Sequence, residues 1–169
     1  MSVSLRAILS DITTLDVDAI VNAANDQLAP GGGVCGAIHR AAGPELAEAC
    51  ALLAPCPAGE ARVTPGFNLP ARLVIHAVGP RWLGGDQGEA ELLASAYRSA
   101  FHLAKESRVR SIAFPAISTG VFGYPLHPAA AIALRVTREV APASGVEEVV
   151  FVCFSEEVLA AYRKEGVDE

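Results

Sequence analysis

Short apolar runs alternate with longer amphipathic runs along this chain, and together they predict its secondary structure. Runs rich in Val, Ile, Leu and Phe have the length of buried strands, at residues 3–9, 19–21, 61–64, 73–78, 111–114 and 148–154. Runs with apolar residues near helical spacing predict helices at residues 34–42, 44–53, 89–107, 125–140 and 156–164. Pro44 and Pro125 are expected in the first turns of two of these helices.

Strands that alternate with helices, and that are apolar on both faces, are typical of a parallel sheet covered on both sides. We therefore predict an α/β fold, a three-layer α/β/α sandwich around a mixed, mostly parallel sheet. The 169 residues are enough for a sizeable core, so we expect one domain spanning residues 1–169. Stretches rich in glycine and proline at residues 55–59 and 84–88 are predicted to be loops.

The composition restricts the classes of protein to which the chain can belong. Hydrophobic residues make up 51% of the sequence and charged residues 19%, a balance that argues against disorder. The formal net charge of −6 argues against general binding to nucleic acids, which needs a basic face. No apolar run approaches a membrane span of about 20 residues, and the first residues lack the apolar core of a signal peptide. The four cysteines have no disulfide-framework spacing, so we expect a soluble cytoplasmic protein.

Two glycine-bearing stretches, GGGVCGAIH at residues 31–39 and PAISTGVFGYP at residues 115–125, each follow an apolar run and lead into a predicted helix. At such corners the backbone N–H groups are free to point at an anion. Neither stretch contains Lys or Arg, so backbone amides and helix dipoles would hold any phosphate. Two such loops at the carboxyl ends of parallel strands predict one cleft, suited to a diphosphate flanked by two sugars.

A dinucleotide-binding fingerprint is one alternative, because Gly31, Gly33 and Gly36 match its GxGxxG spacing. The fingerprint also needs an acidic residue about 20 positions later, at the end of the next strand. Residues 51–55 read ALLAP, which supply neither the acid nor the strand. This disfavours an NAD(P) dehydrogenase. A P-loop is excluded because no Gly-Lys-Ser/Thr occurs.

A wider set of motifs is more specific. In chain order they are DIT at 11–13, IVNAAN at 20–25, GGGV at 31–34, AIHRAAG at 37–43, IHAVGP at 75–80 and STGVFGYP at 118–125. This order resembles the macrodomain family, specifically its MacroD-type branch, and is particularly similar to bacterial O-acetyl-ADP-ribose deacetylases. The resemblance spans residues 6–163. It implies ADP-ribose and its esters as ligands, ADP-ribosylated proteins as partners, and chemistry without a cofactor or metal ion.

The resemblance also implies an adenine site. Asp11 would accept a hydrogen bond from the adenine amino group, with the N–H of Ile12 beside it. The alternative for Asp11 is a turn or cap residue. Phe154, at the end of the last predicted strand, would stack on adenine; the alternative is a core aromatic.

At the other end of the ligand, Asn25 would bond the distal ribose, and the alternative is an Asx-type turn before the glycine loop. Tyr124 would approach the same ribose, and the alternative is a packed loop aromatic. Backbone groups of the two loops would hold the ribose and diphosphate; they belong to Gly32, Gly33, Val34, Ser118, Thr119, Gly120, Val121 and Phe122. His39 and His76 match family positions and are expected to be structural.

Position 35 departs from the family pattern, because MacroD-type hydrolases usually have an acidic residue there and this chain has Cys35. That acid is thought to help order the distal ribose and the attacking water. Losing one polar group at a reacting centre commonly costs about 10²–10³ in rate. Hydrolysis is therefore less secure than ADP-ribose binding, which depends on backbone amides.

Three interpretations of Cys35 follow. The thiol fills space in a site that binds, or hydrolyses slowly. Hydrolysis instead stays efficient through Asn25, Tyr124 and the substrate phosphate. In the third, Cys35 is a nucleophile paired with His39 four residues on. A zinc site on these two residues lacks two further ligands. We predict a hydrolase with Asn25, Cys35 and Tyr124 at the reacting centre; the alternative is a reader module that binds ADP-ribose without turnover.

Overall fold

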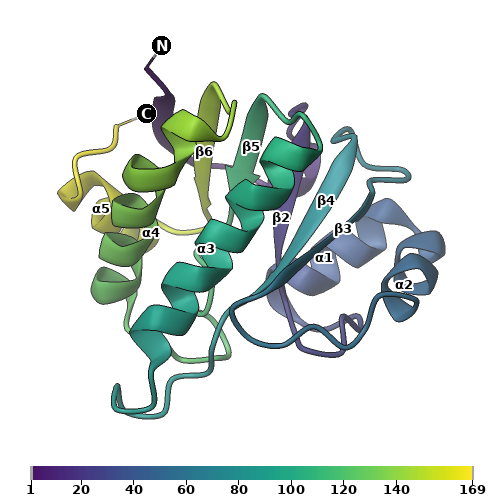
Figure 1. The fold of residues 1–169 in the computed structure, drawn as a ribbon, viewed down its shortest axis with the longest axis horizontal. Helices are drawn as coiled ribbons and strands as arrows, with labels where there is room; N and C mark the ends of the chain where they lie inside the picture. Colours follow the sequence, from purple (N-terminus) through teal and green to yellow (C-terminus); the bar gives the residue numbers. More distant parts are fainter. Residues whose placement is uncertain (1, 169) are drawn as a thin grey trace.

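The computed structural model describes residues 2–168, whose strands form one six-stranded sheet with helices packed against it (Figure 1). The strands are β1 (Ser4–Leu9), β2 (Ala19–Ala24), β3 (Ala61–Pro65), β4 (Leu73–Val78), β5 (Ser111–Phe114) and β6 (Glu148–Cys153). The helices are α1 (Gly33–Ala42), α2 (Pro44–Ala51), α3 (Glu89–Glu106), α4 (Leu126–Val140) and α5 (Glu156–Lys164). Two short 3₁₀ turns, η1 (Ile12–Thr14) and η2 (Ala141–Ala143), complete the described elements.

The strand order is β1-β6-β5-β2-β4-β3, and β3 alone among these strands pairs antiparallel with its neighbour. The other five strands run parallel, so their carboxyl ends lie along one edge of the sheet. The register pairs Leu9 with Cys153 and Ala24 with Val78 at that edge. The predicted mixed, mostly parallel sheet is confirmed.

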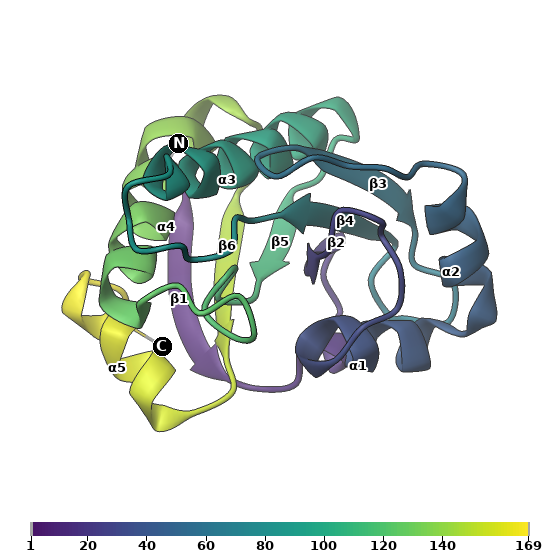
Figure 2. The same ribbon diagram turned by 90° about the horizontal axis from the view of Figure 1, so that it is seen from below.

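Helices cover both faces of the sheet. Figure 2 shows α3 and α4 on one side and α1 and α2 on the other, with α5 beside β1. Alternate residues of each strand enter the two cores: Val21 of β2 packs with the α3–α4–α5 layer, and Ile20 packs with the α1–α2 layer. The three-layer sandwich follows from strands that are apolar on both faces, as predicted.

Most elements begin and end within two residues of their predicted positions, and two differences have a structural reason or consequence. Strand β2 continues to Ala24 instead of ending at residue 21, and it carries a buried Asn22 that is 1% exposed. The Asn22 amide lies 3.0 Å from the ring of His76 on the adjacent β4, which satisfies part of this polar side chain within the core. Pro125 is the N-cap of α4, with an extended backbone, so its predicted place in the first turn is wrong; Pro44 does lie there.

The four cysteines are buried and free of disulfides. Burial raises the pKa of Cys50 and of Cys153 to about 11, and it also raises the pKa of Cys56. Within residues 2–168, no helix is both long and apolar enough to cross a membrane.

Candidate functional site

A cavity of about 1010 Å³ lies at the carboxyl ends of the five parallel strands. Residues at or just after the end of each of these strands contribute to its wall, as expected for a site in a parallel sheet. Apart from Tyr124, the predicted site residues all line it: Asp11, Ile12, Asn25, Gly32, Gly33, Val34, Cys35, Ser118, Thr119, Gly120, Val121, Phe122 and Phe154. The structure therefore brings the two glycine loops into a single site.

At the β1–β6 end, Asp11 caps the short turn η1. One carboxylate oxygen, Oδ1, accepts hydrogen bonds from the Thr13 hydroxyl at 2.7 Å and the Thr13 N–H at 3.0 Å. These bonds lower the pKa of Asp11. The cap role is thus present, and Oδ2 has no hydrogen-bond partner within residues 2–168. Phe154 is 80% exposed at the cavity wall, so its interpretation as a core aromatic is wrong.

The first glycine loop ends in α1, with Gly32 as N-cap and Gly33 at a φ of 56°, a left-handed conformation that glycine adopts without strain. The N–H groups of the first helical turn have no acceptor inside the helix. Asn25 fixes the start of the loop: Oδ1 accepts from the N–H groups of Gln27 and Ala29, and Nδ2 donates to the Ala29 carbonyl at 2.8 Å. The Asx-type turn is therefore present at the cavity wall.

The second glycine loop, residues 115–125, exposes backbone N–H groups at the cavity wall. Ser118, at a φ of 70°, donates from Oγ to the Pro80 carbonyl at 2.8 Å, which ties the loop to the end of β4. The N–H groups of residues 120–122 donate no hydrogen bond within the described part of the chain. A Cβ built on Gly120 would meet no atom within 4 Å. This stretch offers unpaired donors beside open space, as an anion site requires.

Tyr124 does not reach the cavity. It is 4% exposed, and its ring packs on Trp82 with 4.7 Å between centroids. Burial raises the pKa of Tyr124, and the nearby charge of Glu89 adds to that effect. Tyr124 is a packed loop aromatic, and the predicted contact with a distal ribose is not supported, because Trp82 and the loop itself occupy its surroundings.

Cys35 lies at the first turn of α1, 6% exposed, with its Sγ 3.6 Å from the Ala29 carbonyl and 3.7 Å from the Asn22 amide nitrogen. Behind it, the same amide nitrogen lies 3.0 Å from Nδ1 of His76, whose Nε2 lies 3.0 Å from the Thr64 hydroxyl. Burial, assisted by the charge of His39, lowers the pKa of His76 to about 3, so the ring is neutral at pH 7. Both ring nitrogens of His76 are therefore engaged by neutral polar groups, the Asn22 amide at Nδ1 and the Thr64 hydroxyl at Nε2. The thiol is held by a fixed buried network that the sequence did not reveal.

The interpretation of Cys35 and His39 as a catalytic pair is wrong. Neither ring nitrogen of His39 has a hydrogen-bond partner within residues 2–168, although positions four apart share a helix face. Side chains on one helix lean in the same direction, and here the ring and the thiol do not meet. The described residues also hold no group of three or more His, Cys, Asp or Glu side chains placed to bind a metal ion.

The sequence is similar to those of known proteins that contain a Macro domain. The sequence pattern of the Macro domain matches residues 21–133, a span that contains both glycine loops. The chain belongs to the macrodomain family. A Macro domain-containing protein of Chlorobaculum tepidum is 58% identical over 164 residues, covering 96% of this chain and 95% of that protein. A Klebsiella pneumoniae protein named O-acetyl-ADP-ribose deacetylase is 55% identical over 169 residues, covering 97% of each.

Solved macrodomain structures share the fold. The Oceanobacillus iheyensis macrodomain with ADP superposes with a TM-score of 0.91 at 46% identity, covering 95% of this chain and 88% of that one. The Trypanosoma brucei macrodomain in complex with ADP-ribose superposes with a TM-score of 0.89 at 44% identity, covering 96% of this chain and 68% of that one.

Arg81 lines the cavity of this macrodomain but was not predicted from the sequence. Arg81 is exposed, and its guanidinium carbon lies 5.0 Å from the centroid of the Phe122 ring. Among the described residues that line the cavity, Arg81 is the one cation and Asp11 the one carboxylate. Arg81 directly follows the IHAVGP motif, just past the end of β4. Its position at the carboxyl edge of the predicted sheet could have indicated a cavity residue.

Glu89, at the start of α3, organises the loop that follows Arg81. Its carboxylate accepts hydrogen bonds from the N–H groups of Leu83 at 2.8 Å, Gly85 at 2.9 Å and Gln87 at 2.7 Å. Burial alone would raise the pKa of Glu89, but the backbone N–H bonds dominate and lower it to about 2. The carboxylate is therefore ionised at neutral pH and holds the 83–87 loop.

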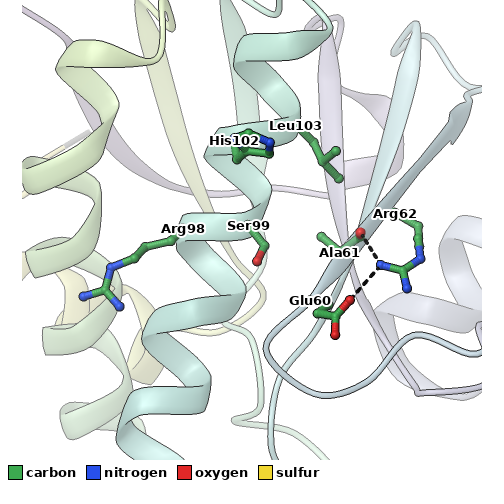
Figure 3. A pocket seen from close by; sticks show the side chains of 7 residues that line it. All are labelled: Glu60, Ala61, Arg62, Arg98, Ser99, His102 and Leu103. Atoms are coloured by element: carbon green, nitrogen blue, oxygen red, sulfur yellow. Dashed lines mark hydrogen bonds and ion pairs between the residues drawn. The ribbon is translucent and has the colours of Figure 1, made fainter.

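A second, shallower groove of about 300 Å³ lies between β3 and α3 (Figure 3). Its basic residues are each engaged: Arg62 pairs with Glu60 at 3.3 Å, Arg98 with Glu91 at 3.0 Å, and His102 contacts Glu106 at 2.9 Å. Figure 3 shows the Arg98 side chain extending away from β3. These pairs leave little net charge for an anion, so the larger cavity is the better candidate for the functional site of this macrodomain.

Proposed function

We propose that this macrodomain binds ADP-ribose in the cavity between its two glycine loops. The observation that carries the proposal is a pair of backbone N–H rows, at the first turn of α1 and at residues 120–122, that border one cavity and have no partner within residues 2–168. Such rows suit a diphosphate, which needs several donors. The Trypanosoma brucei structure in complex with ADP-ribose supports the same ligand.

The ligand's direction follows from the chemistry at each end. The free carboxylate oxygen of Asp11 suits the adenine amino group, and the exposed ring of Phe154 suits stacking on the base. The distal ribose then lies near Asn25 and Cys35, at the β2 end of the cavity. Asn25 keeps one amide N–H that bonds nothing within residues 2–168, and that hydrogen suits a ribose hydroxyl.

We propose that the activity is ester hydrolysis, of O-acetyl-ADP-ribose or of ADP-ribose esters on protein carboxylates. A water held at the distal ribose adds to the ester carbonyl carbon, the bond to the ribose oxygen breaks, and ADP-ribose and a carboxylic acid are released. The name of the Klebsiella pneumoniae relative supports this reaction class. Because Cys35 supplies no carboxylate, we expect a rate about 10²–10³ lower than an acidic residue at this position would give.

The alternative is a reader that binds ADP-ribose without turnover. The contacts of Cys35 favour it: the thiol faces the Ala29 carbonyl and the Asn22 amide, and these contacts leave it poorly placed to activate a water. The two functions share one binding site, so affinity does not separate them.

Product release distinguishes the two functions. We would measure ADP-ribose formed from O-acetyl-ADP-ribose and from a carboxylate-linked ADP-ribosylated protein, with ADP-ribose affinity measured in parallel by calorimetry. The variants are Cys35→Asp, Asn25→Ala and, as a matched control without added charge, Cys35→Ser.

Slow turnover by the natural chain, abolished by Asn25→Ala, raised about 10²-fold by Cys35→Asp and unchanged by Cys35→Ser, is the expected result. Turnover confined to Cys35→Asp would make the protein a reader. Absence of ADP-ribose binding by the natural chain would refute the proposed ligand itself.

A further inference from the structure

The cavity has one cation that the proposed contacts with ADP-ribose leave unused. We propose that Arg81 forms an anion subsite beyond the distal ribose, which favours ADP-ribose carried on acidic protein segments over the free nucleotide. This inference rests on the proposed function, and it adds the class of substrate.

The strand that Arg81 follows lies away from the strands at the proposed adenine end of the cavity. Asp11 and Phe154 follow β1 and β6, which lie at one side of the sheet, whereas Arg81 follows β4, beyond β5 and β2. With adenine at the β1–β6 end and the distal ribose beside β2, the next group along the ligand axis is whatever the ribose carries. Arg81 itself lies over Phe122, because its neighbours Pro80 and Trp82 are bonded to Ser118 and Phe122 of the loop that follows β5. We therefore place the acyl group or protein that the ribose carries within reach of Arg81.

The guanidinium is positioned by its surroundings. It lies over the Phe122 ring, and the backbone carbonyl of Phe122 accepts a hydrogen bond from the Trp82 N–H at 2.8 Å, so the two loops are joined at this point. Glu89 holds the loop beyond Trp82 through three backbone bonds. A stacked guanidinium on a held loop loses less side-chain freedom when it binds an anion than a free surface arginine loses.

Arg81 also has no competing internal partner. The ion pairs found within residues 2–168 engage Arg62 and Arg98 but not Arg81. The one carboxylate among the described residues of the cavity wall, Asp11, follows β1 and is bonded to Thr13. In a molecule of net charge −6, a cation at the cavity wall lowers the electrostatic cost of binding a carboxylate at that point.

The partner's chemistry follows from what surrounds the ester. The phosphates of the ligand meet rows of backbone N–H groups, which leaves the planar fork of Arg81 for another anion, and this fork pairs bidentately with a carboxylate as well as with a phosphate. An ADP-ribosylated Glu or Asp within an acidic segment carries further carboxylates within a few residues of the ester. We therefore assign the subsite to side-chain carboxylates that flank the modified residue.

The test uses four ligands: ADP-ribose, a dimer of ADP-ribose, and ADP-ribose joined by a hydrolysis-resistant linkage to two peptides of equal length. One peptide has Glu on both sides of the attachment point and the other has Gln. Affinities are measured by fluorescence anisotropy at low and high ionic strength. Variant Arg81→Gln is compared with Arg72→Gln, which removes the same charge from an exposed arginine just before the amino end of β4, across the sheet from the cavity.

We expect the Glu conjugate to bind about three- to fivefold more tightly than the Gln conjugate at low salt, the range of an exposed ion pair. Arg81→Gln should remove this preference and high salt should weaken it, while Arg72→Gln retains it. Equal binding of the two conjugates by the natural chain would overturn the inference and leave the proposed function standing.

Two other outcomes would also overturn it. The first is an equal loss of affinity of Arg81→Gln for free ADP-ribose and for the Glu conjugate, which would place Arg81 in the diphosphate site. The second is a preference, dependent on Arg81, for a dimer of ADP-ribose over the Glu conjugate, which would make the anion a phosphate. Failure of the natural chain to bind ADP-ribose at all would refute the proposed function as well.

Discussion

At the scale of single residues, this cavity combines backbone donors with a few polar side chains. Glycines, and N–H groups that bond nothing within residues 2–168, form part of its wall, and Asp11 and Arg81 are the charged side chains among its described residues. A change at one of these glycines acts through the space that the new side chain fills. Where a Cβ would meet no atom, as at Gly120, the packing of the folded protein is expected to stay intact.

Gly120→Glu is expected to abolish ADP-ribose binding while the protein stays folded. The new side chain extends from a position where a Cβ meets nothing within 4 Å, so it enters the cavity without a clash, and its charge opposes the diphosphate. We expect affinity to fall at least about 100-fold, or about 2.7 kcal/mol, by calorimetry. Gly120→Ala, which adds one methyl group, is the control and should retain most of the binding. Unchanged binding by Gly120→Glu would show that the diphosphate lies elsewhere.

The sequence predicted the residues of the cavity better than their surroundings. Loop positions could be predicted because motif order placed both glycine stretches after strands, and the structure brings them together. Tyr124 was misplaced because its partner, Trp82, is 42 positions away in the chain and nothing in the spacing links the two rings. Arg81 was missed because it lies one residue beyond a quoted motif, and its contact with Phe122 depends on tertiary structure.

At the scale of elements, two loops that follow different strands behave as one unit. The Trp82 N–H donates to the Phe122 carbonyl, and the Ser118 hydroxyl donates to the Pro80 carbonyl. The order of the 83–87 loop depends on Glu89, which belongs to α3. The start of α3 therefore supports the cavity without lining it.

Glu89→Gln is expected to loosen this loop. An amide side chain cannot accept at both terminal atoms, so at least one of the three N–H groups loses its partner. Hydrogen exchange at Leu83, Gly85 and Gln87 should accelerate by about tenfold or more. Glu91→Gln, which changes an exposed carboxylate in the same helical turn, should leave these rates unchanged. Equal protection in both variants would contradict the role of Glu89.

The pH dependence of the same contact has a defined sign. The pKa of Glu89 is lowered in the folded state to about 2 from an ordinary value of 4.5. Its contribution to stability is therefore complete above about pH 4.5 and is lost as the pH falls toward 2. The loop should stay protected through the physiological range and open in acid.

Element types were predictable, but strand partners were not. Apolar runs and their spacing located the strands and helices, because each element buries an apolar face. The end of β2 was placed too early because Asn22 interrupts the apolar run, and only its partner His76 on β4 explains a polar residue there. The order β1-β6-β5-β2-β4-β3 depends on contacts distant in sequence, which local patterns do not encode.

At the scale of the whole molecule, stability should fall in mild acid because of His76. The folded state keeps this ring neutral, with a pKa of about 3, whereas the unfolded chain protonates it near pH 6.5. The unfolded state thus binds more protons between these values, and the free energy of unfolding decreases as the pH falls through that window. We expect His76 to account for a loss of about 2 kcal/mol between about pH 7 and pH 5, measured by urea denaturation.

His76→Gln also disturbs the bonds to Asn22 and Thr64, so its absolute stability is not informative. The variants are therefore compared by the slope of the unfolding free energy against pH. His76→Gln should flatten the dependence of unfolding free energy on pH. His102→Gln, at an exposed position of α3, should retain the natural slope. A full slope in His76→Gln would assign the acid sensitivity to other groups.

The positions of the four cysteines should allow the cavity to be labelled selectively with a thiol reagent. Cys50, Cys56 and Cys153 are fully buried and have raised pKa values, and although Cys153 also lies at the cavity wall, Cys35 is the cysteine there that has exposed surface. An alkylating reagent small enough to enter should therefore label Cys35 first, and a bound nucleotide should shield it. One mass shift then reports occupancy without an attached dye. An electrophile carried on a nucleotide scaffold would bond covalently to this macrodomain and spare relatives that have a carboxylate at the same position.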